Sequence, residues 1–126
     1  MNGILYVALG GGLGAASRHL VNLWAQRLMG TAFPYGTMVV NILGSFLMGV
    51  LIGWLSLKLD GSDNFKLFLA TGFLGGFTTF SAFSLDAFML LEKKEFGALM
   101  AYITGSVFIA IAALMLGLWI SRKVFA

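Results

Sequence analysis

The sequence predicts an all-α integral membrane protein with four transmembrane helices, and three observations carry this prediction. Of its 126 residues, 60% are hydrophobic and 10% are charged, and the mean hydropathy is +0.95, which excludes a water-soluble core. Four apolar segments reach the roughly 20 residues that a bilayer crossing needs: about 4–28, 35–57, 65–91 and 96–120. The short connections leave no room for a soluble domain, so we expect residues 1–126 to form a single four-span transmembrane domain.

The charged residues and the missing cysteines exclude several function classes. The eight Lys and Arg residues sit at the ends of the apolar segments rather than in one patch, so we expect no nucleic-acid partner. The absence of cysteine rules out disulfides, thiol catalysis and cysteine-bound metal. The N-terminus has no basic leader region, so we interpret the first apolar segment as a retained span. The chain is therefore expected to be a multi-pass protein embedded in a lipid bilayer.

The third span carries the most informative stretch of the chain, Gly72 to Ser84 (GFLGGFTTFSAFS). Adjacent Gly75 and Gly76 each disfavour a helix by about 1 kcal/mol relative to alanine, and several hydroxyl groups need hydrogen-bond partners inside hydrocarbon. Backbone that leaves helical geometry at membrane depth persists only when it is buried in protein or lines a polar cavity. We therefore expect the third helix to be broken near its middle, with carbonyl groups free to hold an ion or substrate.

The distribution of positive charge predicts that the chain inserts in both orientations. Four spans place the N-terminus, the second loop and the C-terminus on one side, and the first and third loops on the other. If Arg18 within the first span is left aside, the Lys and Arg residues near the span ends number four on the first side and three on the second: Lys58, Lys66, Arg122 and Lys123 against Arg27, Lys93 and Lys94. Because orientation follows an excess of Lys and Arg on the cytoplasmic side, this near balance predicts dual topology and assembly as an antiparallel homodimer.

Small residues on the first two spans are typical of close helix packing. Gly10 and Gly14 form a GxxxG pair, and Ser45, Gly49 and Gly53 continue a stripe at spacing four. Ordinary tight packing between helices explains these residues, and such packing is also compatible with a dimer.

Polar side chains recur at membrane depth on the second and fourth spans. Thr37, Asn41 and Ser45 lie at i, i+4 and i+8 and therefore share one helix face. The Asn41 amide either forms a hydrogen bond between helices or lines a pathway, and the pattern leaves both interpretations open. Tyr102 and Ser106 share a face of the fourth span, which makes a second polar track.

Arg18 and the phenylalanines of the third span each allow two interpretations. Arg18 follows a short apolar run, so it either anchors the helix end to headgroups or attracts anions into a vestibule. We assign the adjacent His19 no catalytic role. Phe77, Phe80 and Phe83 recur at spacing three; they either pack in the core or offer an anion their ring edges, which carry partial positive charge.

These residues resemble the Fluc (CrcB) fluoride channels of bacteria. The resemblance covers the whole chain and rests on three motifs: GxxGAxxR at Gly11 to Arg18, GTxxxN at Gly36 to Asn41, and GFLGGFTTFSxFS at Gly72 to Ser84. It implies a passive fluoride-selective ion channel in the bacterial inner (cytoplasmic) membrane that protects against fluoride toxicity, and not an enzyme. It also implies an antiparallel homodimer with two narrow pores, the assembly that the charge count predicts independently.

The resemblance further implies roles for individual residues. Phe80 and Phe83 would contact fluoride through their ring edges, and Asn41 would line the pore beside them. Gly75 and Thr78 would offer backbone carbonyls to a central structural Na+ shared by both subunits, a hard cation that takes oxygen ligands. The other implied positions are the pore residues Thr37, Ser81, Ser84, Tyr102 and Ser106, with Arg18 at the pore entrance.

Three residues depart from the family's pattern. Ala82 lacks a hydroxyl that the family commonly has, Asp86 is shorter than the common glutamate, and Ala110 stands where the polar track often has another hydroxyl. None of these differences removes Asn41 or a pore phenylalanine, so we expect conduction to persist.

Two alternatives stand beside the channel. A small multidrug exporter has about this length, four spans and dual topology, but it would need a membrane-embedded carboxylate, and the first two spans contain no acid. A purely structural membrane subunit would explain the glycines, yet it would leave Asn41 and the broken third span without a purpose.

Overall fold

The computed structural model describes residues 2–57 and 63–125, and this part of the chain is helical apart from short connections. Its elements are α1 (Asn2–Met29), α2 (Tyr35–Leu57), α3 (Asp63–Lys66), η1 (Leu67–Leu74), α4 (Gly75–Phe77), α5 (Ser81–Glu92) and α6 (Phe96–Phe125). Four helical stretches are long and apolar enough to cross a membrane: Gly3–Met29, Tyr35–Leu55, Asn64–Glu92 and Phe96–Phe125. The predicted all-α architecture with four spanning helices is confirmed. Lys58, which enters the charge count, lies outside the described residues.

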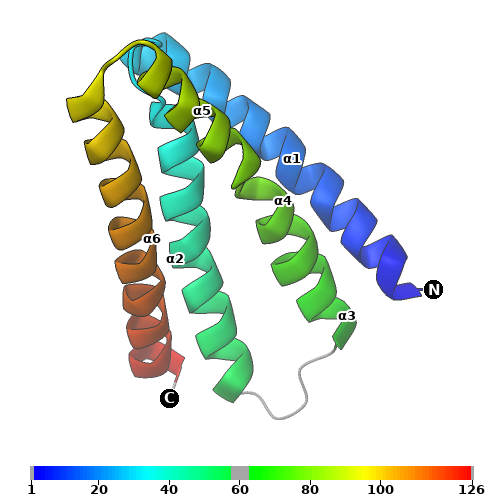
Figure 1. The fold of residues 1–126 in the computed structure, drawn as a ribbon. Helices are drawn as coiled ribbons and strands as arrows, with labels where there is room; N and C mark the ends of the chain where they lie inside the picture. The colour runs from blue at the N-terminus through cyan, green and yellow to red at the C-terminus, as the bar shows by residue number, and fades with distance from the viewer. Residues whose placement is uncertain (1, 58–62, 126) are drawn as a thin grey trace.

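The two halves of the third span pack against different helices (Figure 1). α2 packs along α6, while α1 packs along η1 and α4, the first part of the third span. After the break, α5 contacts α6 and α2. The N- and C-terminal ends of the described chain lie at one end of the molecule, and the α1–α2 and α5–α6 connections lie at the other.

The turn between α1 and α2 depends on a glycine and a proline. Gly30 has a φ of 79°, and its N–H donates to the Gln26 carbonyl at 3.0 Å. A glycine in this left-handed conformation commonly ends a helix because it has no Cβ. Pro34 directly precedes α2, a place where its missing N–H leaves no helical hydrogen bond unmade. Together they bring α2 back alongside α1.

Glycines let the backbones of neighbouring helices touch. In the α2–α6 pair, a Cβ at Gly49 would overlap the Leu114 carbonyl and a Cβ at Gly117 would overlap the Phe46 carbonyl, so the close contact is reciprocal. The GxxxG pair of α1 approaches backbone carbonyls of η1 in the same way. The predicted small-residue stripes are therefore used for packing within one chain.

The third span leaves helical geometry at residues 78–80. It begins as the short α3 and continues as the π-helix η1, a wider form that is rare and often lies near functional sites. Thr78 has φ −84° and ψ 162°, an extended conformation, and helix resumes at Ser81. The predicted break is confirmed, but Gly75 and Gly76 themselves stay helical, because the Thr78 N–H still makes its helical hydrogen bond at 3.1 Å.

Candidate functional site

The Asn41 side chain, which projects from α2, holds the backbone of the break with both of its polar atoms. Its Nδ2 donates to the Thr79 carbonyl at 2.9 Å, and its Oδ1 accepts the Thr79 N–H at 2.7 Å. These two bonds replace the two backbone hydrogen bonds that Thr79 would make in a continuous helix. Without them, each buried and unpaired group of Thr79 would cost about 1–3 kcal/mol. Asn41 therefore links two helices, which is one of the two roles that the sequence left open.

Two backbone carbonyls at the break lose their usual helical donors. In an α-helix the carbonyl of residue i accepts from the N–H of residue i+4. For Gly75 that donor is the Thr79 N–H, which instead donates to Asn41. For Thr78 it is the Ala82 N–H, which donates to the Thr79 hydroxyl at 3.2 Å. The carbonyl groups of Gly75 and Thr78, the predicted cation ligands, thus do not receive the N–H groups that would bond to them in a continuous helix.

Arg18 reaches the break from α1. Its Nε donates to the Gly76 carbonyl at 3.1 Å, across 58 positions of sequence. Gly76 lies near the C-terminal end of the helical stretch formed by η1 and α4, where a helix dipole is negative and a cation is stabilising. Arg18 lines neither of the two cavities described below. In this chain it contacts the last helical turn before the break.

A groove of about 390 Å³ runs beside the break and gathers residues from three spans. We call it the break groove. Its lining comes from α2, from the third span around the break, and from α6: Asn41, Ser45, Gly75, Thr78, Thr79, Phe80, Phe83, Ser106, Val107, Ala110 and Ile111. Most of the predicted pore and cation residues therefore meet in one place, although they are far apart in the sequence.

The phenylalanine stripe of the third span divides between core and groove. The ring centroids of Phe80 and Phe83 are 5.6 Å apart with planes tilted by 41°, and Phe80 is 77% exposed. Phe83 also contacts Tyr102, at 5.1 Å between centroids. Phe77 is buried and stacks on Phe73. Phe77 therefore serves packing, while Phe80 and Phe83 line the break groove.

Ser106 on α6 supplies a buried hydroxyl to the break groove. The residue is 6% exposed, and its Oγ has no hydrogen-bond partner among the described residues. Because buried hydroxyl groups are almost always paired, an unpaired one that lines a cavity is a place for a ligand or water. One turn earlier, the fully buried Tyr102 donates its OH to Asp86 Oδ2 at 3.1 Å.

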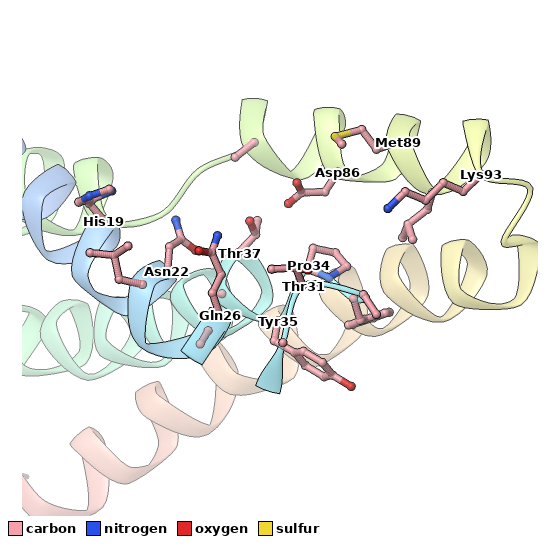
Figure 2. Close-up of a pocket in the computed structure, with 18 residues that line it drawn as sticks. His19, Asn22, Gln26, Thr31, Pro34, Tyr35, Thr37, Asp86, Met89 and Lys93 are labelled. Carbon is pink, nitrogen blue, oxygen red and sulfur yellow. The ribbon is translucent and has the colours of Figure 1, made fainter. Parts of the chain in front are cut away.

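A second cavity, of about 480 Å³, lies at the end of the molecule where α1 turns into α2 (Figure 2). We call it the loop-end cavity. Its polar lining comes from α1, the α1–α2 connection, α2 and the far end of α5: His19, Asn22, Gln26, Thr31, Tyr35, Thr37, Asp86 and Lys93. Tyr102 joins the two cavities, because its ring contacts Phe83 in the break groove and its hydroxyl binds Asp86 in the loop-end cavity.

Sequence reasoning missed much of the loop-end cavity. Asn22, Gln26 and Lys93 were not predicted as site residues, although they line it. The available signal was the spacing of His19, Asn22 and Gln26, which at i, i+3 and i+7 places three polar side chains on one face of the first span.

Of the predicted pore residues, Ser81, Ser84 and Tyr102 line neither cavity. The two serines are exposed, and both make local contacts at the start of α5. The Ser84 hydroxyl donates to the Phe80 carbonyl at 3.0 Å, and the Ser81 hydroxyl lies 3.4 Å from the Thr79 hydroxyl.

A cation at the break could use backbone oxygen. Among residues 2–57 and 63–125, no cluster of three or more His, Cys, Asp or Glu side chains could hold a metal ion. The diverted carbonyl groups of Gly75 and Thr78 form a neutral oxygen donor set. This set fits a hard cation such as Na+, and it does not suit a transition metal, which prefers imidazole or thiolate ligands.

The chain matches known proteins along nearly its whole length. The family described as CrcB-like protein, Camphor Resistance (CrcB), matches residues 5–118. A relative from Caulobacter vibrioides is 47% identical over 127 residues and covers 100% of both chains. One from Hyphomonas neptunium is 52% identical over 127 residues, again 100% of both. One from Cereibacter sphaeroides is 52% identical over 118 residues, 94% of this chain and 93% of the relative. Each of the three bears the name "Fluoride-specific ion channel FluC".

Proposed function

Because the chain belongs to the CrcB-like family, we propose that it is a fluoride-specific ion channel, the activity for which its full-length relatives are named. The observation that carries the proposal furthest is the break groove, where two phenylalanine rings, the Asn41 amide and the unpaired Ser106 hydroxyl meet. Such a site offers an anion positive ring edges and hydrogen-bond donors. Among the described residues that line it, none is a carboxylate that would repel an anion.

Fluoride would cross each subunit between the two cavities. An asparagine amide has two N–H groups; one of those of Asn41 is donated to Thr79, and the other is available to an anion in the break groove. The unpaired Ser106 hydroxyl is the next donor. The path would then reach the loop-end cavity past the Phe83–Tyr102 contact. Its lining in this proposal is Phe80, Phe83, Asn41 and Ser106 in the break groove, Tyr102 between the two cavities, and Thr37 in the loop-end cavity.

Selectivity would follow from the width of the path and the number of its donors. Fluoride is small and strongly hydrated, so it leaves water only where N–H groups, O–H groups and ring edges replace its hydration shell. The larger chloride ion would not fit. The sequence contains no nucleotide-binding motif, and passive flux driven by the membrane potential follows. In the cytoplasmic membrane of a bacterium this flux expels fluoride and protects the cell from it.

We propose that the working assembly is an antiparallel dual-topology homodimer with two pores. Phe80 is 77% exposed and the break groove is open along one side, so a second copy would cover the ring and complete the pore wall. Ser81 and Ser84, both exposed in the single chain, would face a pore only in such an assembly. The near balance of Lys and Arg at the span ends supports insertion in both orientations.

A central Na+ would join the two subunits at their breaks. The ligands in this proposal are the Gly75 and Thr78 carbonyls, whose usual donors are diverted to Asn41 and to the Thr79 hydroxyl. Two carbonyls from each copy would make four oxygen ligands. When bound, the cation would supply a local positive charge that favours a nearby anion.

Anion efflux from liposomes tests the proposed function. The purified dimer is reconstituted into liposomes that contain potassium fluoride and potassium chloride. Valinomycin is added so that K+ can leave with the anion and no opposing voltage builds up, and both anions are followed with ion-selective electrodes. We expect rapid valinomycin-dependent release of fluoride without release of chloride. If a verified dimer released no fluoride, the channel proposal would be wrong, and a multidrug exporter or a structural membrane subunit would be the next hypotheses to test.

A further inference from the structure

The loop-end cavity contains an acidic and a basic side chain on one side of α5. Asp86 and Lys93 are seven residues apart, which is two helical turns and about 10 Å along the axis. Both line the cavity, and in Figure 2 the Lys93 side chain extends along α5 toward Asp86. Because Asp86 also accepts the Tyr102 hydroxyl, the carboxylate stands at the inner end of the cavity. Lys93 directly follows α5 and stands at the outer end.

A carboxylate at the inner end opposes the passage of an anion. Like charges repel more strongly in a partly buried cavity than in bulk water, because the effective dielectric constant is lower. The other described residues that line the cavity carry no fixed charge. Lys93 brings a permanent positive charge into the same cavity. It can therefore offset Asp86 for an anion that arrives from the loop side.

The neighbouring Lys94 provides a comparison within the same turn. Its backbone adopts the left-handed conformation, with φ 59°, and it does not line the cavity. The turn thus directs two adjacent lysines to different surroundings. A simple requirement for positive charge near the membrane surface would treat them alike, whereas a role inside the cavity would involve Lys93 alone.

We propose that the loop-end cavity is a capture site for a hydrated small anion and that Lys93 makes it one by balancing the charge of Asp86. The inference rests on the proposed fluoride flux and names where the ion is collected before it passes Tyr102. A cleft lined by a fixed charge raises the local concentration of the opposite ion, and dissolved salt weakens this effect. The contribution of Lys93 should therefore be largest at low ionic strength.

Fluoride efflux from liposomes at two ionic strengths tests this proposal, with a membrane-impermeant salt on both sides. At about 0.01 M, where the Debye length is about 30 Å, we expect Lys93→Gln to lower fluoride flux about two- to fivefold and Lys93→Glu to lower it further. At about 1 M, where the Debye length is about 3 Å, both variants should approach the wild-type rate. Lys93→Arg should keep wild-type flux at both salt concentrations, because it keeps the charge. Lys94→Gln is the matched control and should not change flux at either.

The outcomes separate this inference from the proposed function. A wild-type dimer that moves no fluoride would contradict the channel itself. A conducting wild type with an unaffected Lys93→Gln variant at low salt would overturn only the capture site. The same conclusion would follow if Lys93→Gln and Lys94→Gln lowered flux equally, or if the loss with Lys93→Gln persisted unchanged at high salt.

Discussion

The α2–α6 pair and the third span handle backbone polarity within a membrane in opposite ways. α2 and α6 approach each other so closely that Gly49 and Gly117 each meet a carbonyl of the other helix. The third span gives up its helical hydrogen bonds at the break and recovers some of them from side chains, Asn41 on α2 and Arg18 on α1. The α2–α6 pair is joined mainly by close packing of backbones, whereas the break itself is held by hydrogen bonds from side chains to backbone.

This difference assigns a separate task to each region. Close packing of α2 against α6 fixes the position of Asn41 relative to Ser106, which lie on these two helices. The break then exposes the donors and carbonyls that an ion can use. A change at Gly49, about two helical turns from Asn41, should therefore lower stability and leave the flux of the folded protein intact. Changes at the break should lower flux.

Removing the Asn41 amide should have the largest effect. In Asn41→Leu the Thr79 N–H and carbonyl both lose their partner, and each loss costs about 1–3 kcal/mol if the group stays buried. Because the break positions both groove phenylalanines, we expect fluoride efflux to fall by about two orders of magnitude or more, since about 2.8 kcal/mol already corresponds to a hundredfold. Efflux from liposomes and the elution profile of the purified dimer measure the two effects.

The control places the same leucine elsewhere on α2. Val39 is 38% exposed and lines neither cavity, so Val39→Leu should keep both flux and elution profile. Efflux of Asn41→Leu within a few-fold of wild type would mean that the break does not depend on this amide.

Replacing a groove phenylalanine should lower flux while the protein stays folded. In Phe83→Ile or Phe80→Ile a positive ring edge and the Phe80–Phe83 ring pair are both lost, and such a pair alone is worth about 0.5–1.5 kcal/mol beyond the buried area. With the change in pore shape added, we expect fluoride efflux to fall about tenfold or more. Phe88→Ile is the matched control, because Phe88 is an exposed phenylalanine of α5 that lines neither cavity. Equal flux in all three variants would refute an aromatic pore wall.

Adding one methyl group to the α2–α6 contact should affect stability and not flux. The Cβ in Gly49→Ala would overlap the Leu114 carbonyl, and overpacking of this kind costs about 1–3 kcal/mol. We expect a lower melting temperature of the purified dimer and unchanged fluoride flux per folded protein. Gly97→Ala is the opposite case, because nothing lies within 4 Å of its Cβ position and alanine favours a helix by about 1 kcal/mol over glycine. An equal melting temperature for the two variants would show that the glycine contact is loose.

The sequence predicts the spans and the existence of the break because both depend on local composition. Runs of apolar residues define the four helices, and the glycines and hydroxyls between Gly72 and Ser84 mark the third as unsuitable for a continuous one. The shared groove could also be expected, since Asn41, Phe83 and Ser106 are the residues singled out on their spans.

The details that escape prediction depend on contacts between distant segments. The break lies three residues beyond Gly75 because Thr79 finds its partners on α2, and no local pattern specifies this. Arg18 was expected at a pore entrance, and its contact with the Gly76 carbonyl, 58 positions away, could not be derived from spacing. Lys93 lines a cavity because residues of α1 and of the α1–α2 connection lie opposite it, and spacing along the chain does not specify this.

The smallest expected effect concerns a polar contact within the α2–α6 pair that resembles those at the break. The buried Ser121 hydroxyl donates to the Val50 carbonyl at 2.8 Å, but that carbonyl lies inside a continuous helix. Ser121→Ala therefore removes a hydrogen bond that the Val50 carbonyl accepts in addition to its helical one. The free energy of unfolding should fall by about 0.5–1.5 kcal/mol, with no change in flux.

The control, Thr104→Ala, removes an exposed hydroxyl that bonds only within α6, to the Met100 carbonyl, and should be close to neutral. Melting curves and fluoride efflux of both variants provide the measurement. If Ser121→Ala lowered flux as strongly as a change at the break, the two regions would share one task, because a hydroxyl far from the break groove would then control conduction.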